Sequence, residues 1–247
     1  MLCTMDISWL SRTSLLIGET AVRHLNNAHV MVVGLGGVGS FAAEFIARSG
    51  IGKMTIIDGD TVDPSNRNRQ LPALATTHGM PKATLMQERL LAINPELELT
   101  AVSSFVSPEM VAAQLAKKPD YIIDAIDSIT PKLTFIKMAF DSGIALVSSM
   151  GAGAKLDPTR LQVVDIAKTY NCPFAQQVRK QLKRRYGIRK GIKVVFSPEE
   201  PIKESLMLTD GSNFKKSAYG TISYLPATFG AVTASVVIRD LIATTAR

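Results

Sequence analysis

The chain has 247 residues, of which 46% are hydrophobic and 20% charged, so it is long enough to bury a sizeable core. This composition excludes an intrinsically disordered chain. The formal net charge of +7 favours an anionic partner such as nucleic acid, although many basic proteins bind none.

Cysteine usage narrows the chemistry further. Cys3 and Cys172 are the only cysteines, and they do not form a CxxC pair. This excludes a disulfide scaffold and a four-cysteine zinc site, and it fits a reducing compartment. The N-terminus lacks a basic start followed by an apolar run, so no secretory signal is expected. We therefore expect a cytoplasmic protein.

Apolar β-branched runs alternate with helical patterns through the first 150 residues. The predicted strands are 29–34, 53–58, 97–102, 121–125 and 144–149, and the clearest helices are 37–49 and 82–93. Such alternation is typical of a parallel sheet covered on both faces and built from right-handed crossovers. We therefore predict an α/β fold with a Rossmann-like, doubly wound, mainly parallel sheet.

The regular alternation of strand and helix patterns ends after about residue 150. Strands are predicted at 161–166 and 193–196, a helix at 173–186, and a long functional or mobile loop at 197–223. We interpret residues 1–150 as one domain and 151–247 as a C-terminal α/β extension packed on the same sheet.

The apolar stretch 224–243 is long enough to suggest a membrane span. Pro226 lies near its start, and Arg239 and Asp240 lie near its end. Charges are costly inside a bilayer, so a buried or dimer-facing helix is the favoured interpretation.

A glycine-rich segment, GLGGVG at 34–39, follows the first predicted strand and opens a helix. Glycine lets the backbone approach a phosphate, and the helix N-terminus offers free N–H groups. Asp58 ends the next strand, about twenty residues later, where a carboxylate reaches a ribose. This pattern predicts a nucleotide site and fits a nicotinamide dehydrogenase as well as an ATP user. Glycines that serve only helix–strand packing are the structural alternative.

The residues after Asp58 favour the ATP user. A dehydrogenase binds a pyrophosphate that stays intact, whereas an adenylating enzyme must stabilise a triphosphate attacked at its α-phosphorus. Arg69 and Lys82 can supply the added positive charge. Asp127 lies just past a predicted strand, at the edge where ligands bind, and is the candidate magnesium ligand. Asp124, within that strand, is interpreted as structural.

Together GLGGVG, the DGD at 58–60, SNRNRQ at 65–70, the Pro81–Lys82 pair and DAIDS at 124–128 resemble the ubiquitin-activating (ThiF/MoeB-like) superfamily. The resemblance implies that the chain binds ATP and Mg²⁺ as cofactors. The expected ATP-binding residues are Gly36, Gly37, Asp58, Asp60, Asn66, Asn68, Arg69, Gln70 and Lys82. The expected catalytic residues are Arg12, Arg69, Lys82 and Asp127, with Asp127 holding the metal. Arg12 matches an arginine that reaches the partner subunit's site in this superfamily, so a homodimer is expected.

The second half resembles one group within that superfamily. GAGAKLDP at 151–158, VDIAKT at 164–169, VFS at 195–197 and ATFG at 227–230 are similar to tRNA threonylcarbamoyladenosine dehydratases. This implies a dehydratase that adenylates the threonyl carboxylate of N6-threonylcarbamoyladenosine in tRNA and cyclises it with release of AMP. Ring closure is intramolecular and needs no enzyme thiol, so Cys172 is expected to be inert. The loop at 197–223 is short and cysteine-free beside some relatives.

A basic cluster lies in the helix 173–186 and just past its end. The candidate tRNA contacts are Arg179, Lys183, Arg184, Arg185, Arg189 and Lys190, and Lys215 and Lys216 are weaker candidates. Such spacing suits a phosphate backbone. The structural alternative is a solvated helix end whose cations complement the helix dipole.

Three other functions stay open at this point. The main alternative is an adenylyltransferase that activates the C-terminus of a ubiquitin-like carrier protein. A nicotinamide-dependent oxidoreductase leaves Asn68, Arg69 and Lys82 unexplained. A non-catalytic nucleotide-binding subunit leaves Arg69, Lys82 and Asp127 without a role.

Overall fold

A seven-stranded sheet forms the centre of the computed structural model, which describes residues 8–208 and 217–244. The strand order is β3-β2-β1-β4-β5-β7-β6, and all neighbours are parallel except β6 and β7. The strands are β1 (His29–Val33), β2 (Lys53–Ile57), β3 (Glu98–Val102), β4 (Tyr121–Asp124), β5 (Ala145–Ser149), β6 (Gln162–Asp165) and β7 (Lys193–Phe196). The predicted mainly parallel, doubly wound α/β fold is confirmed.

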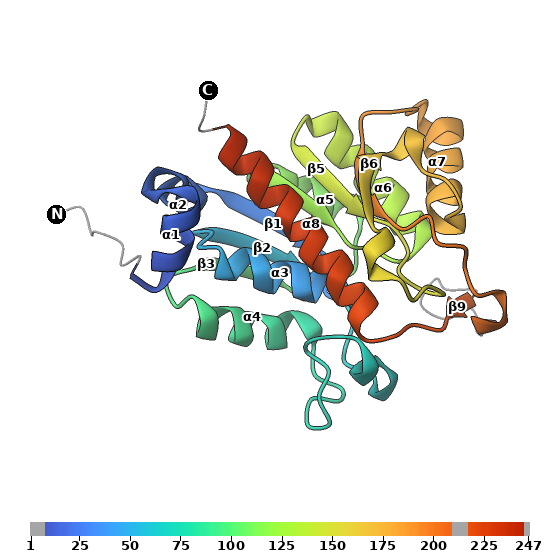
Figure 1. The fold of residues 1–247 in the computed structure, drawn as a ribbon, viewed down its shortest axis with the longest axis horizontal. Coiled ribbons are helices and arrows are strands. Elements are labelled where there is room, and N and C mark those ends of the chain that lie inside the picture. The colour runs from blue at the N-terminus through green and yellow to red at the C-terminus, as the bar shows by residue number, and fades with distance from the viewer. Residues whose placement is uncertain (1–7, 209–216, 245–247) are drawn as a thin grey trace.

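Helices cover both faces of this sheet (Figure 1). They are α1 (Ser11–Ile17), α2 (Glu19–Asn27), α3 (Gly39–Arg48), α4 (Lys82–Ile93), α5 (Pro108–Leu115), α6 (Ile129–Ser142), α7 (Pro173–Tyr186) and α8 (Tyr224–Ala243). α2, α3, α4 and α8 share one apolar core, which includes Leu25, Ile46 and Phe229. α5, α6 and α7 pack on the opposite face, in cores that include Phe135 and Leu182.

Most predicted elements are found within two residues of their expected bounds. α1 and α2 were not predicted. The interpretation of 197–223 as a loop throughout is wrong, because β8 (Leu206–Leu208) pairs antiparallel with β9 (Ser217–Tyr219). Each of these strands has three residues, which is too short for the sequence to show a clear periodicity. Cys3, Lys215 and Lys216 lie outside the described residues.

The apolar helix α8 meets the length and composition of a membrane span, with a mean hydropathy of 1.4, but half of its apolar window is buried inside the fold. A Cβ on Gly230 would lie 2.6 Å from the carbonyl oxygen of Val38, so α8 packs very closely against the start of α3. Asp240 accepts hydrogen bonds from the hydroxyl of Tyr121 and from the ammonium of Lys193. Asp240 on α8 therefore connects β4 and β7 through side-chain hydrogen bonds.

Candidate active site

The sheet topology brings three strand ends together. β1 lies between β2 and β4, and Val33 at its end is in register with both Ile57 and Asp124. The glycine loop, Asp58 and the Asp127 segment follow these three residues directly. The strand order proceeds to β2 and β3 on one side of β1 and to β4 and β5 on the other. Ligands of doubly wound sheets bind at such a switch point.

Two glycines of the loop, Gly37 and Gly39, are closely packed against other parts of the chain, whereas Gly36 has free space beside it. A Cβ on Gly39 would lie 1.7 Å from the carbonyl oxygen of Gly34, so only glycine allows α3 to start this close to β1. A Cβ on Gly37 would lie 2.9 Å from Cβ of Pro226. On Gly36 the nearest atom would be Nε2 of Gln70, at 3.8 Å. Packing within the chain therefore leaves room at Gly36.

Asp58 connects the end of β2 to the glycine loop. Its two carboxylate oxygens accept backbone hydrogen bonds from Leu35 at 2.6 Å and from Asp60 at 2.8 Å. Burial raises the pKa of Asp58, and the nearby Lys82 opposes this effect. Each oxygen keeps a further lone pair, so the carboxylate can also accept hydrogen bonds from ribose hydroxyls.

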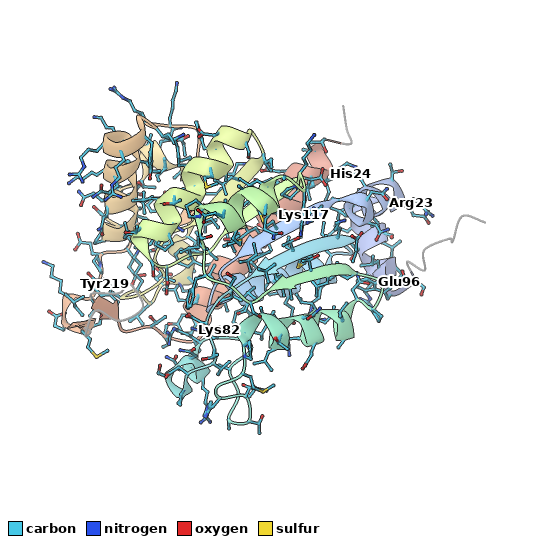
Figure 2. All side chains as sticks on the ribbon, turned by 180° about the vertical axis from the view of Figure 1, so that it is seen from behind. Arg23, His24, Lys82, Glu96, Lys117 and Tyr219 are labelled. Atoms are coloured by element: carbon cyan, nitrogen blue, oxygen red, sulfur yellow. The ribbon has the colours of Figure 1, made fainter. Side chains whose placement is uncertain are left out.

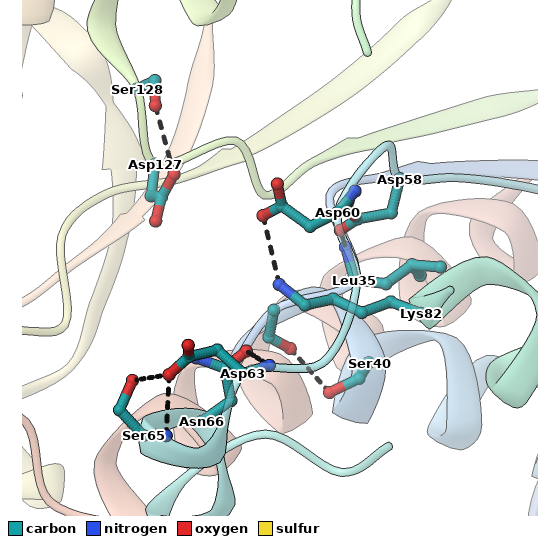
Figure 3. A network of polar contacts seen from close by, with 11 residues as sticks. Leu35, Ser40, Asp58, Asp60, Asp63, Ser65, Asn66, Lys82, Asp127 and Ser128 are labelled. Carbon is teal, nitrogen blue, oxygen red and sulfur yellow. Dashed lines mark hydrogen bonds and ion pairs between the residues drawn. The ribbon is translucent and has the colours of Figure 1, made fainter. Parts of the chain in front are cut away.

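Lys82 and Asp60 form an ion pair beside Asp58. Lys82 begins α4 and is only 5% exposed, and its Nζ lies 3.1 Å from a carboxylate oxygen of Asp60. Figure 3 shows the charged ends of Lys82, Asp60 and Asp127 pointing toward the same space. The site thus combines one buried cation with carboxylates from two strand ends.

The segment after Asp60 forms a 3-10 turn, η2 (Pro64–Asn68), that holds its own side chains. Asn66 is buried, and its side-chain oxygen accepts a hydrogen bond from the backbone N–H of Asp63. The carboxylate of Asp63 in turn accepts the backbone N–H of Ser65. Asn66 therefore stabilises this turn from inside and is only 8% exposed, and its contact with ATP stays a prediction.

Asn68, Arg69 and Gln70 follow at the open side of η2. The amide of Asn68 donates to the carbonyl oxygen of Thr221 at 2.9 Å, and it accepts a hydrogen bond from Arg69 at 2.8 Å. The side-chain oxygen of Gln70 is buried and has no hydrogen-bond partner in the described part of the chain. This segment therefore links the glycine loop to residues just before α8.

The segment before Asp127 is held by a buried clamp formed by Lys132. The ammonium of Lys132, on α6, lies 2.7 Å from Asp124 and donates to the carbonyl oxygens of Ile126 and Ser149. Burial lowers the pKa of Lys132, against the raising effect of Asp124. Both side chains are fully buried, so Asp124 is structural, as expected. The exposed Asp127 follows this clamp directly.

Arg12 does not reach the site of its own chain. It lies exposed on α1, which continues through α2 into the start of β1, whereas the glycine loop follows the end of β1. Figure 2 shows Arg23 and His24 of α2 at one end of the sheet and Lys82 toward the other. Arg12 can therefore act only at the site of another copy.

The basic cluster on α7 also lies away from the glycine loop. Phe174, in the first turn of α7, packs against Gly151 just past the end of β5, and the helix exit leads into the start of β7. The cluster is therefore at the opposite edge of the sheet, about 21 Å along the helix. The exposed cations of the cluster are Lys183, Arg184, Arg185, Arg189 and Lys190. Arg179 is half-buried instead, and its guanidinium donates to Thr169.

Three residues near the site were not identified from the sequence alone. Pro226 packs on Gly37, Lys132 clamps the segment before Asp127, and the buried Lys155 lines a hollow together with Asn68. Lysines in a helix or after a glycine-rich segment are usually solvated, so no sequence signal identified these two as buried.

A family model described as the ThiF family matches residues 10–246. The chain belongs to the ThiF family. The tRNA threonylcarbamoyladenosine dehydratase of Bacillus subtilis is 42% identical over 239 residues, and the match covers 94% of each chain. The enzyme of the same name from Escherichia coli is 40% identical over 259 residues, with 97% of each chain covered.

The fold of this chain also matches that of a solved dehydratase structure. The E. coli tRNA N6-threonylcarbamoyladenosine dehydratase in complex with ATP matches with a TM-score of 0.90 at 39% identity, over 100% of this chain and 99% of that one. A structure of the E. coli enzyme with AMP matches equally well. The similarity of this ThiF-family chain therefore includes residues 151–247 as well as the nucleotide-binding half.

Proposed function

We propose that this chain is an ATP-dependent dehydratase that adenylates the threonyl carboxylate of N6-threonylcarbamoyladenosine in tRNA and cyclises it with release of AMP. The observation that carries this proposal is the near full-length similarity to dehydratases, one of which is solved with ATP and with AMP. The position of Lys82, Asp58 and Asp127 at one edge of the sheet supports the same chemistry.

ATP binding follows from the geometry of the strand ends. The open backbone at Gly36 and the N-terminus of α3 suit the phosphates, and Asp58 suits the ribose. Lys82 and Arg69 supply positive charge beside them. Their charge stabilises the α-phosphorus when it carries additional negative charge in the transition state.

The reaction then has two balanced steps. A carboxylate oxygen of the threonyl group attacks the α-phosphorus, the bond to the bridging oxygen breaks, and pyrophosphate leaves. A nucleophile within the same modified nucleoside attacks the acyl carbon, and AMP leaves with the former carboxylate oxygen. The second step is intramolecular, so orientation replaces an enzyme nucleophile. Cys172 is buried and fits a structural role.

Magnesium fits this site as an ion shared with the nucleotide. The described residues contain no group of three or more His, Cys, Asp or Glu side chains that could hold a metal by themselves. Mg²⁺ in nucleotide sites is commonly held by one or two carboxylates together with phosphates and water. Asp127, exposed just past β4, would hold the ion, which neutralises phosphate charge when bound.

Two surface features indicate the partners, which are tRNA and a second copy of this chain. The exposed cations at the end of α7, including Lys183 and Arg189, support contact with a tRNA backbone. Their distance from Asp127 means that they contact a part of the RNA away from the modified nucleoside. A homodimer in which Arg12 enters the partner's site is supported by Leu15 and Leu16 beside it, which are 88% and 85% exposed. Such an enzyme acts in the cytoplasm.

The test is ATP consumption with tRNA that does or does not carry threonylcarbamoyladenosine, with mass spectrometry of the nucleoside. We expect AMP release coupled to loss of one water from the modified nucleoside. Lys82→Ala and Asp127→Ala are each expected to lower kcat by about a hundredfold or more. Lys168→Ala, at an exposed lysine on η4 (Ile166–Lys168), is the control.

The opposite outcome identifies the alternative function. ATP–pyrophosphate exchange that requires a ubiquitin-like protein, with the tRNA unchanged, would replace the dehydratase with a carrier-protein adenylyltransferase.

A further inference from the structure

Three lysines of the described chain are almost fully buried, and one of them has no carboxylate partner there. Lys82 pairs with Asp60, and Lys132 pairs with Asp124. Lys155 is 3% exposed, and none of the ion pairs between described residues includes it. Its ammonium donates to the carbonyl oxygen of Ser197 at 2.6 Å, which uses one of three N–H donors. A buried charge without a counter-ion is costly, so this ammonium is suited to an anion from outside.

Lys155 lines a hollow of about 420 Å³. Its lining includes Asn68, Lys155, Leu156, Ile202, Thr221 and Ile222. Backbone hydrogen bonds build the walls, from Ala154 N to the oxygen of Gly220 at 2.8 Å and from Ile202 N to the oxygen of Ala154 at 2.9 Å. Ala154 has φ 61°, a left-handed conformation that costs free energy outside glycine and concentrates at functional sites.

The hollow opens beside the segment that we assign to ATP. Asn68 is part of its lining, and Asn68 is hydrogen-bonded to both Thr221 and Arg69. The backbone oxygen of Arg69 would lie 3.3 Å from a Cβ on Gly37, so Arg69 adjoins the glycine loop. In the view of Figure 2, Lys82 lies between Tyr219, which is next to this wall, and Arg23 of α2. A group in the hollow is therefore near the expected nucleotide.

We propose that this hollow is the acceptor subsite and that Lys155 binds the carboxylate that is to be adenylated. This inference rests on the proposed function, because an attacking carboxylate and the triphosphate repel one another unless a cation lies beside them. Leu156, Ile202 and Ile222 provide apolar walls for the uncharged part of the acceptor. The volume is within the usual range for small-molecule sites, roughly 300–1,000 Å³.

The experiment compares two anticodon stem–loop RNAs that differ only in carrying threonylcarbamoyladenosine or adenosine. Wild type is expected to bind the modified RNA more tightly. Lys155→Met, which keeps the length and removes the charge, is expected to lose most of this preference and to lower kcat/KM for the modified RNA about 10- to 100-fold. The Kd for ATP is expected to stay within about twofold, because Lys155 contacts the acceptor and not the nucleotide.

Lys203→Met is the matched control, because it removes the same charge from an exposed lysine next to the hollow. It is expected to keep the preference for the modified RNA. An unchanged preference in folded Lys155→Met overturns the acceptor subsite, even when wild type is an active dehydratase. Wild type that releases AMP with neither RNA refutes the proposed function instead.

A second pair of variants decides the matter when Lys155→Met does not fold. Ile222 is 38% exposed in the hollow lining, and Ile222→Asp and Ile222→Asn differ there only in charge. The aspartate is expected to raise KM for the modified RNA about fivefold over the asparagine, and added salt is expected to reduce the difference. Equal KM values for the two variants contradict an incoming carboxylate.

Discussion

At the scale of single residues, the site depends on where packing restricts the chain and where it leaves space. Gly39 is required by the chain itself, since its Cβ would meet the oxygen of Gly34 at 1.7 Å. Gly36 is not required in this way. Its backbone is outside the left-handed region, and a Cβ would meet only Gln70 at ordinary contact distance. A need for glycine at position 36 would therefore come from the proposed nucleotide and not from packing within the chain.

This contrast gives a prediction for two alanine variants. Gly36→Ala is expected to fold with a Tm near that of wild type and to weaken ATP binding about tenfold or more, because the methyl group blocks the close approach of phosphate. Gly39→Ala is expected to lose about 3 kcal/mol or more of unfolding free energy through overpacking. Thermal unfolding and calorimetric titration with ATP check both. Normal ATP affinity in Gly36→Ala would show that the phosphates lie elsewhere.

At the scale of elements, α3 and α4 are joined by one carboxylate. Glu44 on α3 lies 2.5 Å from Arg89 of α4 and 2.9 Å from Arg48 of its own helix. Burial raises the pKa of Glu44, but hydrogen bonds from Arg89 and Arg48 outweigh that effect, so its pKa is lowered in the fold. A lowered carboxyl pKa stabilises the fold above the unfolded-state value of 4.5, and this contribution is lost as pH falls through the folded-state pKa.

Glu44→Gln is therefore expected to lower the unfolding free energy by about 1 kcal/mol near neutral pH, a modest loss because both arginines are half exposed. The difference from wild type is expected to shrink below the ordinary pKa of 4.5. Urea unfolding across this pH range measures it. Glu88→Gln, an exposed position on α4, is the control and is expected to change stability by less than about 0.5 kcal/mol. A pH-independent loss would contradict the role of the charge.

At the scale of the whole molecule, the sheet separates Arg12 from the glycine loop of the same chain. α1 and α2 lie at the edge where β1 begins, and the candidate site lies at the edge where it ends (Figure 1). A site that includes Arg12 is therefore complete only in an assembly of at least two copies. The single isologous interface of a twofold dimer would complete two sites at once.

Mixing inactive variants tests this arrangement. Arg12→Ala and Lys82→Ala are each expected to be inactive alone, and activity is expected to return when the two are refolded together. In a mixed dimer, the subunit with intact Lys82 receives Arg12 from its partner, so one of two sites is complete. AMP release by the mixture, compared with each variant alone, is the measurement. No recovery in a mixture shown to contain mixed dimers would place Arg12 outside the partner's site.

Local patterns in the sequence by themselves determined the succession of strands and helices along the chain. They also determined the position of the glycine loop and of the acidic residues at the strand ends. Periodicity is a property of each segment, and parallel strands must end at one edge, so Asp58 and Asp127 were predicted near the loop at 34–39. The helices at 82–93, 173–186 and 224–243 were predicted with their observed bounds for the same reason.

Only the tertiary structure decided which charges are buried and what faces them. Lys132 and Lys155 resemble solvated lysines in the sequence, yet the fold buries both, because strands and helices far along the chain cover them. The fold likewise places Arg12 and the end of α7 at the edge away from the glycine loop. Burial and pairing depend on residues distant in sequence, and a local pattern carries no information about them.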